Sequence, residues 1–128
     1  MRWIFLLPLL VGCSANDQIR LQQTLDEYAL LSAQSRPLAS VLTGEALQSA
    51  QRSSQLLQDL KISQRGLAEF EVWSAEAGVG SGCLDLSEVE LVNEKGELVN
   101  PARPDRVEFQ AHYADDLISS LVISERPC

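Results

Sequence analysis

The chain has 128 residues, and its 18 acidic and 10 basic side chains give a formal net charge of −8. This length suits one domain with a modest hydrophobic core. The acidic excess provides no basic surface of the kind that nucleic-acid binding requires, so we expect no nucleic-acid partner.

The first twelve residues have the pattern of an export signal. Arg2 precedes an apolar run over residues 3–12. This run has the length of a secretory hydrophobic segment and about half the ~20 residues that a membrane-spanning helix needs. The sequence LVGC at residues 10–13 resembles the bacterial lipobox. The resemblance implies that Cys13 receives a diacylglycerol and that the chain is cut immediately before it.

A lipid anchor on Cys13 would decide where the protein resides. Two acyl chains hold a protein stably on a membrane, whereas one chain holds it only marginally. We therefore expect a removed signal peptide at residues 1–12, a lipidated N-terminus with a short tether at 13–17, and one domain at 18–128. The protein would lie on the cell membrane, facing outside the cytoplasm. An ordinary secretory signal with a chance cysteine, or a short buried helix, are the alternatives.

The three cysteines of the chain are Cys13, Cys83 and Cys128. If Cys13 carries lipid, the other two have only each other as partners within the chain. Outside the cytoplasm their disulfide would persist and would hold the C-terminus in place. A bridge between two molecules, or two free thiols, are the alternatives. One histidine and two distant cysteines do not give a zinc-binding spacing, so we predict no metal and no other cofactor.

Charge is distributed unevenly along the chain. Residues 13–68 contain five acids and five bases, whereas residues 69–128 contain thirteen acids and four bases. Anionic lipids would repel the acidic part. We therefore expect the neutral first half to face the membrane and the acidic second half to point away from it.

The first predicted helix follows the tether. Asp17 is a suitable N-cap, and the helical pattern continues to about Gln34. Arg36-Pro37 ends this pattern, because a residue that precedes proline disfavours the helical conformation. The apolar stripe at helical spacing consists of Leu21, Leu25, Tyr28 and Leu31.

A second helix is predicted from Gly44 to about Lys61, with Thr43 as its cap. Its apolar face contains mostly small residues, and serines and glutamines cover the remainder. The apolar positions are Ala46, Ala50, Leu57 and Leu60. Gly66 ends the helical half of the chain.

After Gly66 the apolar period changes to two, which is typical of strands. A first strand around Phe70 is followed by a flexible connection with glycines at 78, 80 and 82. A second strand begins at Cys83 and changes phase near Ser87-Glu88, where a bulge or bend is required. Residues 93–96 form a turn and residues 101–104 an irregular connection. The last strands are 106–113 and 117–124, joined by a turn at residues 114–116.

Helices followed by strands predict an α+β fold, with N-terminal helices packed on a curved antiparallel sheet of about four strands. This order resembles the NTF2-like, or cystatin/cone-shaped, fold. More narrowly, the chain resembles small exported lipoproteins of actinobacteria. The residues that carry the narrower resemblance are Cys83, Asp85, Ser87, Gly96, Arg103, Arg106 and Cys128. The last strand departs from that group because it is aliphatic where an aromatic residue is common. The resemblance implies fold and location but no activity.

Incomplete closure of the helices over the sheet would leave an apolar pocket for a small lipid or other hydrophobic molecule. The alternative is that the same residues simply form the core. The residues expected to line the pocket are Leu21, Leu25, Phe70, Val72, Phe109 and Tyr113.

Other side chains could carry chemistry, but each has a simpler structural explanation. His112 is expected on the solvated face of its strand. The pairs Glu69/Glu71 and Glu88/Glu90 could bind calcium, although such rows usually form a solvated face. The remaining expectations are turn formation by Asp115-Asp116, local pairing among Arg103, Asp105 and Arg106, and burial of Trp73.

We therefore predict a lipid-anchored cell-envelope protein whose domain is a non-enzymatic binding or interaction module, with no catalytic residue assigned. Its partner would be a small apolar ligand or another envelope protein. One alternative is a small isomerase- or dehydratase-type enzyme that uses Tyr113, His112 or an acid in the cone. A structural spacer is the second alternative.

Overall fold

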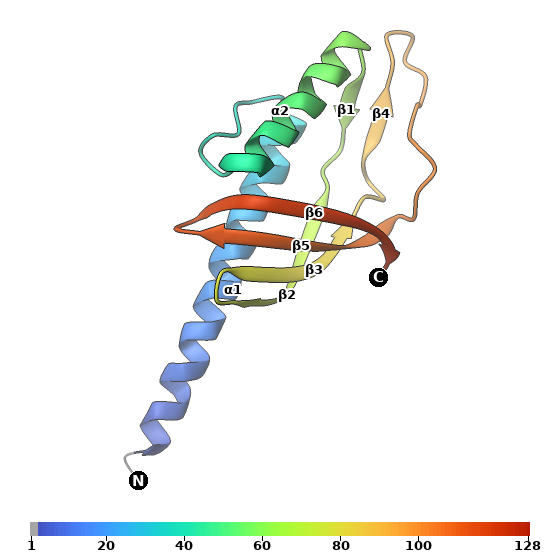
Figure 1. Cartoon of the computed structure of the whole chain (residues 1–128). Helices are drawn as coiled ribbons and strands as arrows, with labels where there is room; N and C mark the ends of the chain where they lie inside the picture. The colour runs from blue at the N-terminus through green and yellow to red at the C-terminus, as the bar shows by residue number, and fades with distance from the viewer. Residues whose placement is uncertain (1–2) are drawn as a thin grey trace.

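The chain forms an α+β fold in which two helices pack against antiparallel sheets (Figure 1). The computed structural model describes the backbone of residues 3–128 and the side chains of residues 16–128. Within this part the elements are α1 (Trp3–Ala33), α2 (Gly44–Asp59), β1 (Ser63–Arg65), β2 (Glu69–Glu76), β3 (Val79–Asp85), β4 (Glu90–Val92), β5 (Arg106–Ala114) and β6 (Leu117–Pro127). The fold class is as predicted, but the larger sheet is not strongly curled.

Helix α1 begins well before the predicted N-cap. Its backbone is helical from Trp3, so Asp17 lies inside the helix and the backbone of residues 13–17 is helical as well. Capping preference is a weak signal here, because the Leu, Ala and Ser residues that precede Asp17 are compatible with a helix. Helix α2 agrees with its prediction to within two residues. Thr43 has the extended backbone of an N-cap but forms no side-chain capping hydrogen bond.

The larger sheet is a meander with the strand order β2-β3-β5-β6, and every neighbouring pair is antiparallel. A tight turn joins the two strands of each hairpin, β2–β3 and β5–β6. Ala77 and Gly78 have φ values of 52° and 80°, and Asp115 and Asp116 have φ values of 50° and 64°. Two consecutive positive φ values are typical of the type I′ turn, whose twist matches that of the strands. The predicted turn at Asp115-Asp116 is confirmed.

Glycines 80 and 82 belong to β3, so the predicted flexible connection is wrong. Their role is steric. A Cβ atom at Gly80 would collide with the Leu21 side chain of α1, and one at Gly82 would collide with the Glu71 carbonyl oxygen. The small residues therefore allow the helix and the neighbouring strand to lie close to β3.

The apolar alternation does change phase after Cys83, but the cause is the end of a strand and not a bulge within one. Strand β3 ends at Asp85, whose Oδ1 accepts hydrogen bonds from the backbone N–H and the hydroxyl of Ser87 at 2.9 and 2.7 Å. The chain then leaves the sheet, and β4 pairs with β1 in a separate two-stranded sheet. Strand β1 was not predicted, because three polar or charged residues give no apolar alternation.

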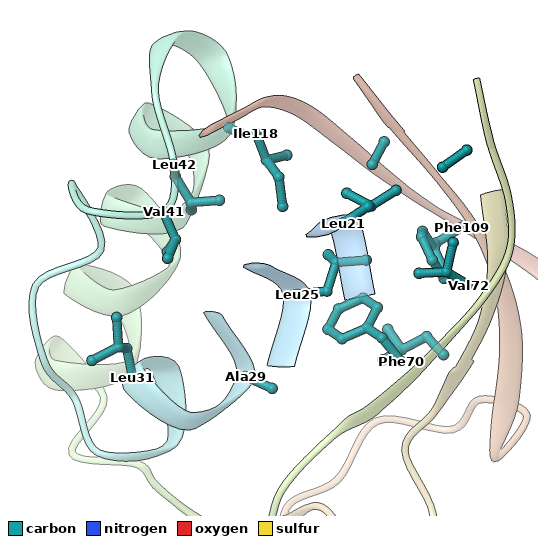
Figure 2. Close-up of a cluster of buried hydrophobic side chains, with 14 of the residues drawn as sticks. Leu21, Leu25, Ala29, Leu31, Val41, Leu42, Phe70, Val72, Phe109 and Ile118 are labelled. Atoms are coloured by element: carbon teal, nitrogen blue, oxygen red, sulfur yellow. The ribbon is translucent and has the colours of Figure 1, made fainter. Parts of the chain in front are cut away.

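One continuous core lies between α1 and the larger sheet (Figure 2). Leu25, Ala111 and Ile118 are fully buried at 0 % exposure. Phe70 contacts Phe109 edge-to-face, with ring centroids 5.2 Å apart. Leu42 lies at the α2 side of this core, where it bridges to Ile118 at the start of β6.

Helix α1 also covers the outer edge of β2. The Gln22 amide group donates to the carbonyl oxygen of Phe70 at 2.6 Å, and its Oε1 accepts from the Val72 N–H at 2.9 Å. The Gln18 amide donates to the Val72 carbonyl oxygen at 2.8 Å. The two glutamines thus occupy the positions of a neighbouring strand, which protects this edge against pairing with another chain.

The predicted disulfide between Cys83 and Cys128 is present, with the two Cα atoms 6.0 Å apart. Cys83 is buried in β3, in register with Glu71 and Glu108. Cys128 reaches it across β5, and its N–H donates to the Arg106 carbonyl oxygen at 3.2 Å. The bond therefore fastens the end of the chain to a central strand of the sheet.

Candidate functional site

A groove of about 330 Å³ opens where the C-terminal part of α1, α2 and β6 meet. Figure 1 shows α2 above β6, the two elements whose side chains face each other across the groove. Helix α2 contributes one wall along most of its length, from Ala46 to Gln58, and Leu121 and Ile123 of β6 form part of the opposite wall. The helices therefore do not close completely over this part of the sheet.

The groove exists because α2 presents small side chains to the sheet. Ala46 is buried and Ala50 is half-buried, whereas Leu56 and Leu60 are each 57 % exposed. Alanines at these positions cannot fill the distance between a helix and a sheet. The result is an open channel where larger residues would have extended the core.

We call this hollow of about 330 Å³ the outer lobe, and its lining mixes apolar residues such as Leu38, Leu57 and Ile62 with polar ones. Six serines line it, together with Gln58 and Gln64. Serine hydroxyls can both donate and accept hydrogen bonds. The serines are Ser32, Ser35, Ser49, Ser53, Ser54 and Ser63.

A second hollow of about 160 Å³, which we call the inner lobe, adjoins the first. Both lobes are lined by Tyr28, Ser32, Gln64, Leu121 and Ile123, so they are parts of one site. Apart from these shared residues, the inner lobe is entirely apolar. Its other walls are Ala29, Ala68, Phe70, Leu84, Leu86 and Val89.

Tyr28 stands at the junction of the two lobes. Its ring contacts Phe70, with centroids 6.0 Å apart, and thereby continues the aromatic row that leads into the core. Burial raises the pKa of its hydroxyl above the ordinary value of 10.0. Tyr28 is therefore protonated at neutral pH and can donate a hydrogen bond to a bound molecule.

Arg36 is the one charged residue among the described residues that line either lobe. It lies in the connection between α1 and α2, where Ser35 adopts a left-handed φ of 54°. The guanidinium donates to Gln34 Oε1 at a long 3.4 Å. None of the ion pairs found among the described side chains includes Arg36. Its positive charge is consequently available to a ligand.

The residues that the sequence placed in a pocket are mainly core residues. Leu21, Leu25, Val72 and Phe109 are buried in the cluster between α1 and the sheet and line neither lobe of the groove. Phe70 does line the inner lobe. The groove is therefore lined mainly by residues other than those expected for the pocket, and Leu21 and Tyr113 line a separate hollow.

Tyr113 lines neither lobe of the groove. It lies beside a separate hollow of about 240 Å³ at the β5–β6 turn, which Asp17, Arg20, Leu21 and Asp116 also line. Its hydroxyl is buried and has no hydrogen-bond partner among the described residues. Burial, and secondarily the charge of Asp17, raise the pKa of this hydroxyl. His112 is exposed on the other face of β5, as predicted.

At the β5–β6 turn the neutral and acidic halves of the sequence are not separated in space as expected. Arg20 Nε donates to Asp116 Oδ1 at 2.9 Å, and this bond lowers the pKa of the Asp116 carboxyl. The acidic β5–β6 turn thus lies beside the part of α1 that follows Cys13. The neutral and acidic halves of the sequence are adjacent at this turn, because the antiparallel hairpins return the second half of the chain to the first.

The remaining predicted positions have structural roles. Trp73 is 49 % exposed beside the bulge of β2, so its predicted burial is wrong. Arg106 pairs with Glu71 of β2 at 3.3 Å rather than with its sequence neighbours. In the part of the chain that the structure describes, no group of three acidic, histidine or cysteine side chains could hold a metal ion. Glu69, Glu88 and Glu90 are exposed.

The lipobox falls outside the described side chains. Cys13 lies within the backbone of α1, and nothing further is shown for its side chain or for Arg2. Among the described residues, no helix has a stretch that is long and apolar enough to span a membrane.

Comparison of the chain with known protein families and with curated proteins finds no match. The candidate site therefore depends on its geometry alone. Sequence patterns had pointed to the apolar stripe of α1, whereas the groove is defined by Tyr28, Arg36 and the serines of α2. The one available signal was the small and polar composition of α2, which indicates a helix that cannot fill the space beside it.

Proposed function

We propose that this protein is a lipid-anchored cell-envelope lipoprotein whose domain binds a small ligand with an apolar part in the groove between α1, α2 and β6. The single observation that carries the proposal is the continuity of an outer lobe of mixed polar and apolar lining, which contains Arg36 and six serines, with an inner lobe whose own walls are apolar. A surface of this kind is suited to amphiphilic ligands, because it can contact the polar group and the apolar group of one molecule at the same time.

The lipobox resemblance supports the anchor, and the disulfide supports an oxidising location outside the cytoplasm. Helix α1 would then connect the anchor to the groove. Tyr28 follows Cys13 by fifteen residues, a distance of about 22 Å along a helix that rises 1.5 Å per residue. A ligand bound in the groove would therefore be held above the membrane surface and would be separated from the lipid.

Binding is favoured over acid–base chemistry by the composition of the lining. The described residues of both lobes include no carboxylate and no imidazole that could exchange protons with a substrate. The arrangement of helices against one face of an antiparallel meander is compatible with an NTF2-like domain, which is the fold that we propose. A pure spacer would have no need of a groove that leads from a charged and serine-lined opening to an apolar hollow.

Closing the inner lobe tests the proposal. Ala68→Leu places an isobutyl group in the inner lobe, and Ala39→Leu adds the same group at an exposed position that lines neither lobe. The full chain, held in an amphipathic polymer to avoid competing micelles, would be titrated with radiolabelled dodecanol. We expect Ala68→Leu to weaken binding by about tenfold or more, since burying several methylene groups contributes ~0.8 kcal/mol each. Equal binding by wild type and both variants would refute the proposal.

A further inference from the structure

We infer that the ligand of the groove is a single-chain amphiphile with an anionic head group, which lies with its chain in the inner lobe and its head group beside Arg36. This inference rests on the proposed function and adds the chemical class of the ligand. It depends on three features of the site, which are the sign of its charge, the order of its walls and the size of its apolar part.

Charge is the first feature. The protein as a whole carries a net charge of −8, so most of its surface repels anions. The groove is an exception, because Arg36 is the one charged group in the lining that the structure describes and has no carboxylate partner there. The planar guanidinium presents several N–H donors and is well suited to a carboxylate or a phosphate.

The order of the walls is the second feature. Arg36 and most of the serines belong to the outer lobe alone, where they share the lining with apolar residues such as Leu38 and Leu57, whereas the residues found only in the inner lobe are all apolar. Tyr28 lines both lobes, and its phenol hydroxyl can donate a hydrogen bond. A molecule with an anionic end and an apolar end therefore satisfies both lobes, with its apolar end in the inner lobe.

The size of the inner lobe is the third feature. Its volume of about 160 Å³ is half that of the outer lobe. Its walls are fixed by buried residues of the core cluster, including Phe70 and Leu84. A narrow hollow with such walls is suited to one alkyl chain, whereas the two chains of a bilayer phospholipid would require the core to open.

The experiment compares three head groups on one chain length. Radiolabelled dodecanoate, dodecyl phosphate and dodecanol are each titrated by equilibrium dialysis into the full chain in amphipathic polymer, at mildly alkaline pH where the carboxylate is ionised. The variants are Arg36→Gln, Arg36→Lys and the control Arg52→Gln. Arg52 is a good control because it is exposed on α2 and lines neither lobe.

We expect at least one anionic amphiphile to bind wild type about fivefold more tightly than dodecanol, the size of effect that an exposed charge pair of ~1 kcal/mol gives. Arg36→Gln should abolish this preference and leave dodecanol binding within about twofold, Arg36→Lys should restore part of it, and Arg52→Gln should leave it unchanged. A preference for the carboxylate would indicate a free fatty acid, and a preference for the phosphate would indicate a lipid phosphate monoester.

Two results would overturn the inference while the proposed function survives. Wild type could bind all three compounds with equal affinity, or Arg52→Gln could weaken the anions as much as Arg36→Gln does, which would show a general effect of charge. Failure of wild type to bind any of the three compounds would refute the proposed function and the inference together.

Discussion

The bond between Cys83 and Cys128 should supply a large part of the stability of the domain. We would remove it with Cys128→Ala in a Cys13→Ser background, which leaves no other thiol to form a new pair. Alanine at 128 is preferable to a substitution at 83. Cys83 is only 1 % exposed, and its free thiol behaves as a small apolar side chain that preserves the packing.

The magnitude follows from the loop that the bond closes. The two cysteines are 45 positions apart, and closing a loop of this length removes about 4 kcal/mol of chain entropy from the unfolded state. Domains of this size have free energies of unfolding of roughly 5–15 kcal/mol. The variant should therefore lose between a quarter and most of its free energy of unfolding and should remain folded.

Urea unfolding followed by far-UV circular dichroism would measure the loss. With an m-value of about 2 kcal/mol/M, a change of about 4 kcal/mol lowers the midpoint by about 2 M. Chemically reduced protein with both cysteines should unfold at the same midpoint as the variant. A loss below about 1 kcal/mol would refute the argument, because it would show that the unfolded chain gains little freedom without the bond.

Three further predictions concern packing and charge. Gln22→Ala should destabilise the domain by about 2 kcal/mol and increase hydrogen exchange in β2, because two backbone groups lose their partners, whereas Gln23→Ala at the exposed neighbouring position should have no such effect. Gly82→Ala should cost about 1–3 kcal/mol in thermal or urea unfolding, since its Cβ requires β2 and β3 to move apart. Arg20→Gln should raise the pKa of Asp116 toward 3.8 in an NMR titration. The contribution of the pair is fully present above the ordinary pKa of the carboxyl, and any stability difference from wild type should vanish as the pH falls through the lowered pKa.

Much of the fold could be predicted because its signals are local. The 3.6-residue stripe of α1, the alternation in β5 and the turn at Asp115-Asp116 each depend on a few neighbouring residues. The chain could not indicate that Gly80 and Gly82 form a strand, because glycine carries no apolar period. Glycine is needed at these two positions because α1 and β2 lie too close to β3 for a larger residue, and this closeness is visible only in the tertiary structure.

The candidate site was harder to predict for a similar reason. A pocket is the space that side chains leave unfilled, whereas an apolar pattern shows which side chains are buried. Leu21 and Leu25 were therefore identified correctly as inward-facing, yet they fill the core. Arg36 was interpreted only as the residue before a helix-ending proline. Its position at a serine-lined groove depends on how α2 packs against β6, which is far from Arg36 in the sequence.

The central claim is that a single alkyl chain occupies the groove, and photolabelling tests it most directly. The full chain in amphipathic polymer would be irradiated with a dodecanoate that carries a diazirine near its methyl end, and labelled peptides would be mapped by mass spectrometry. We predict labels on the walls of the inner lobe, at Ala68, Leu86 or Val89, and their loss in Ala68→Leu. Labels confined to exposed apolar residues outside the groove, such as Leu30 or Leu98, would contradict the claim.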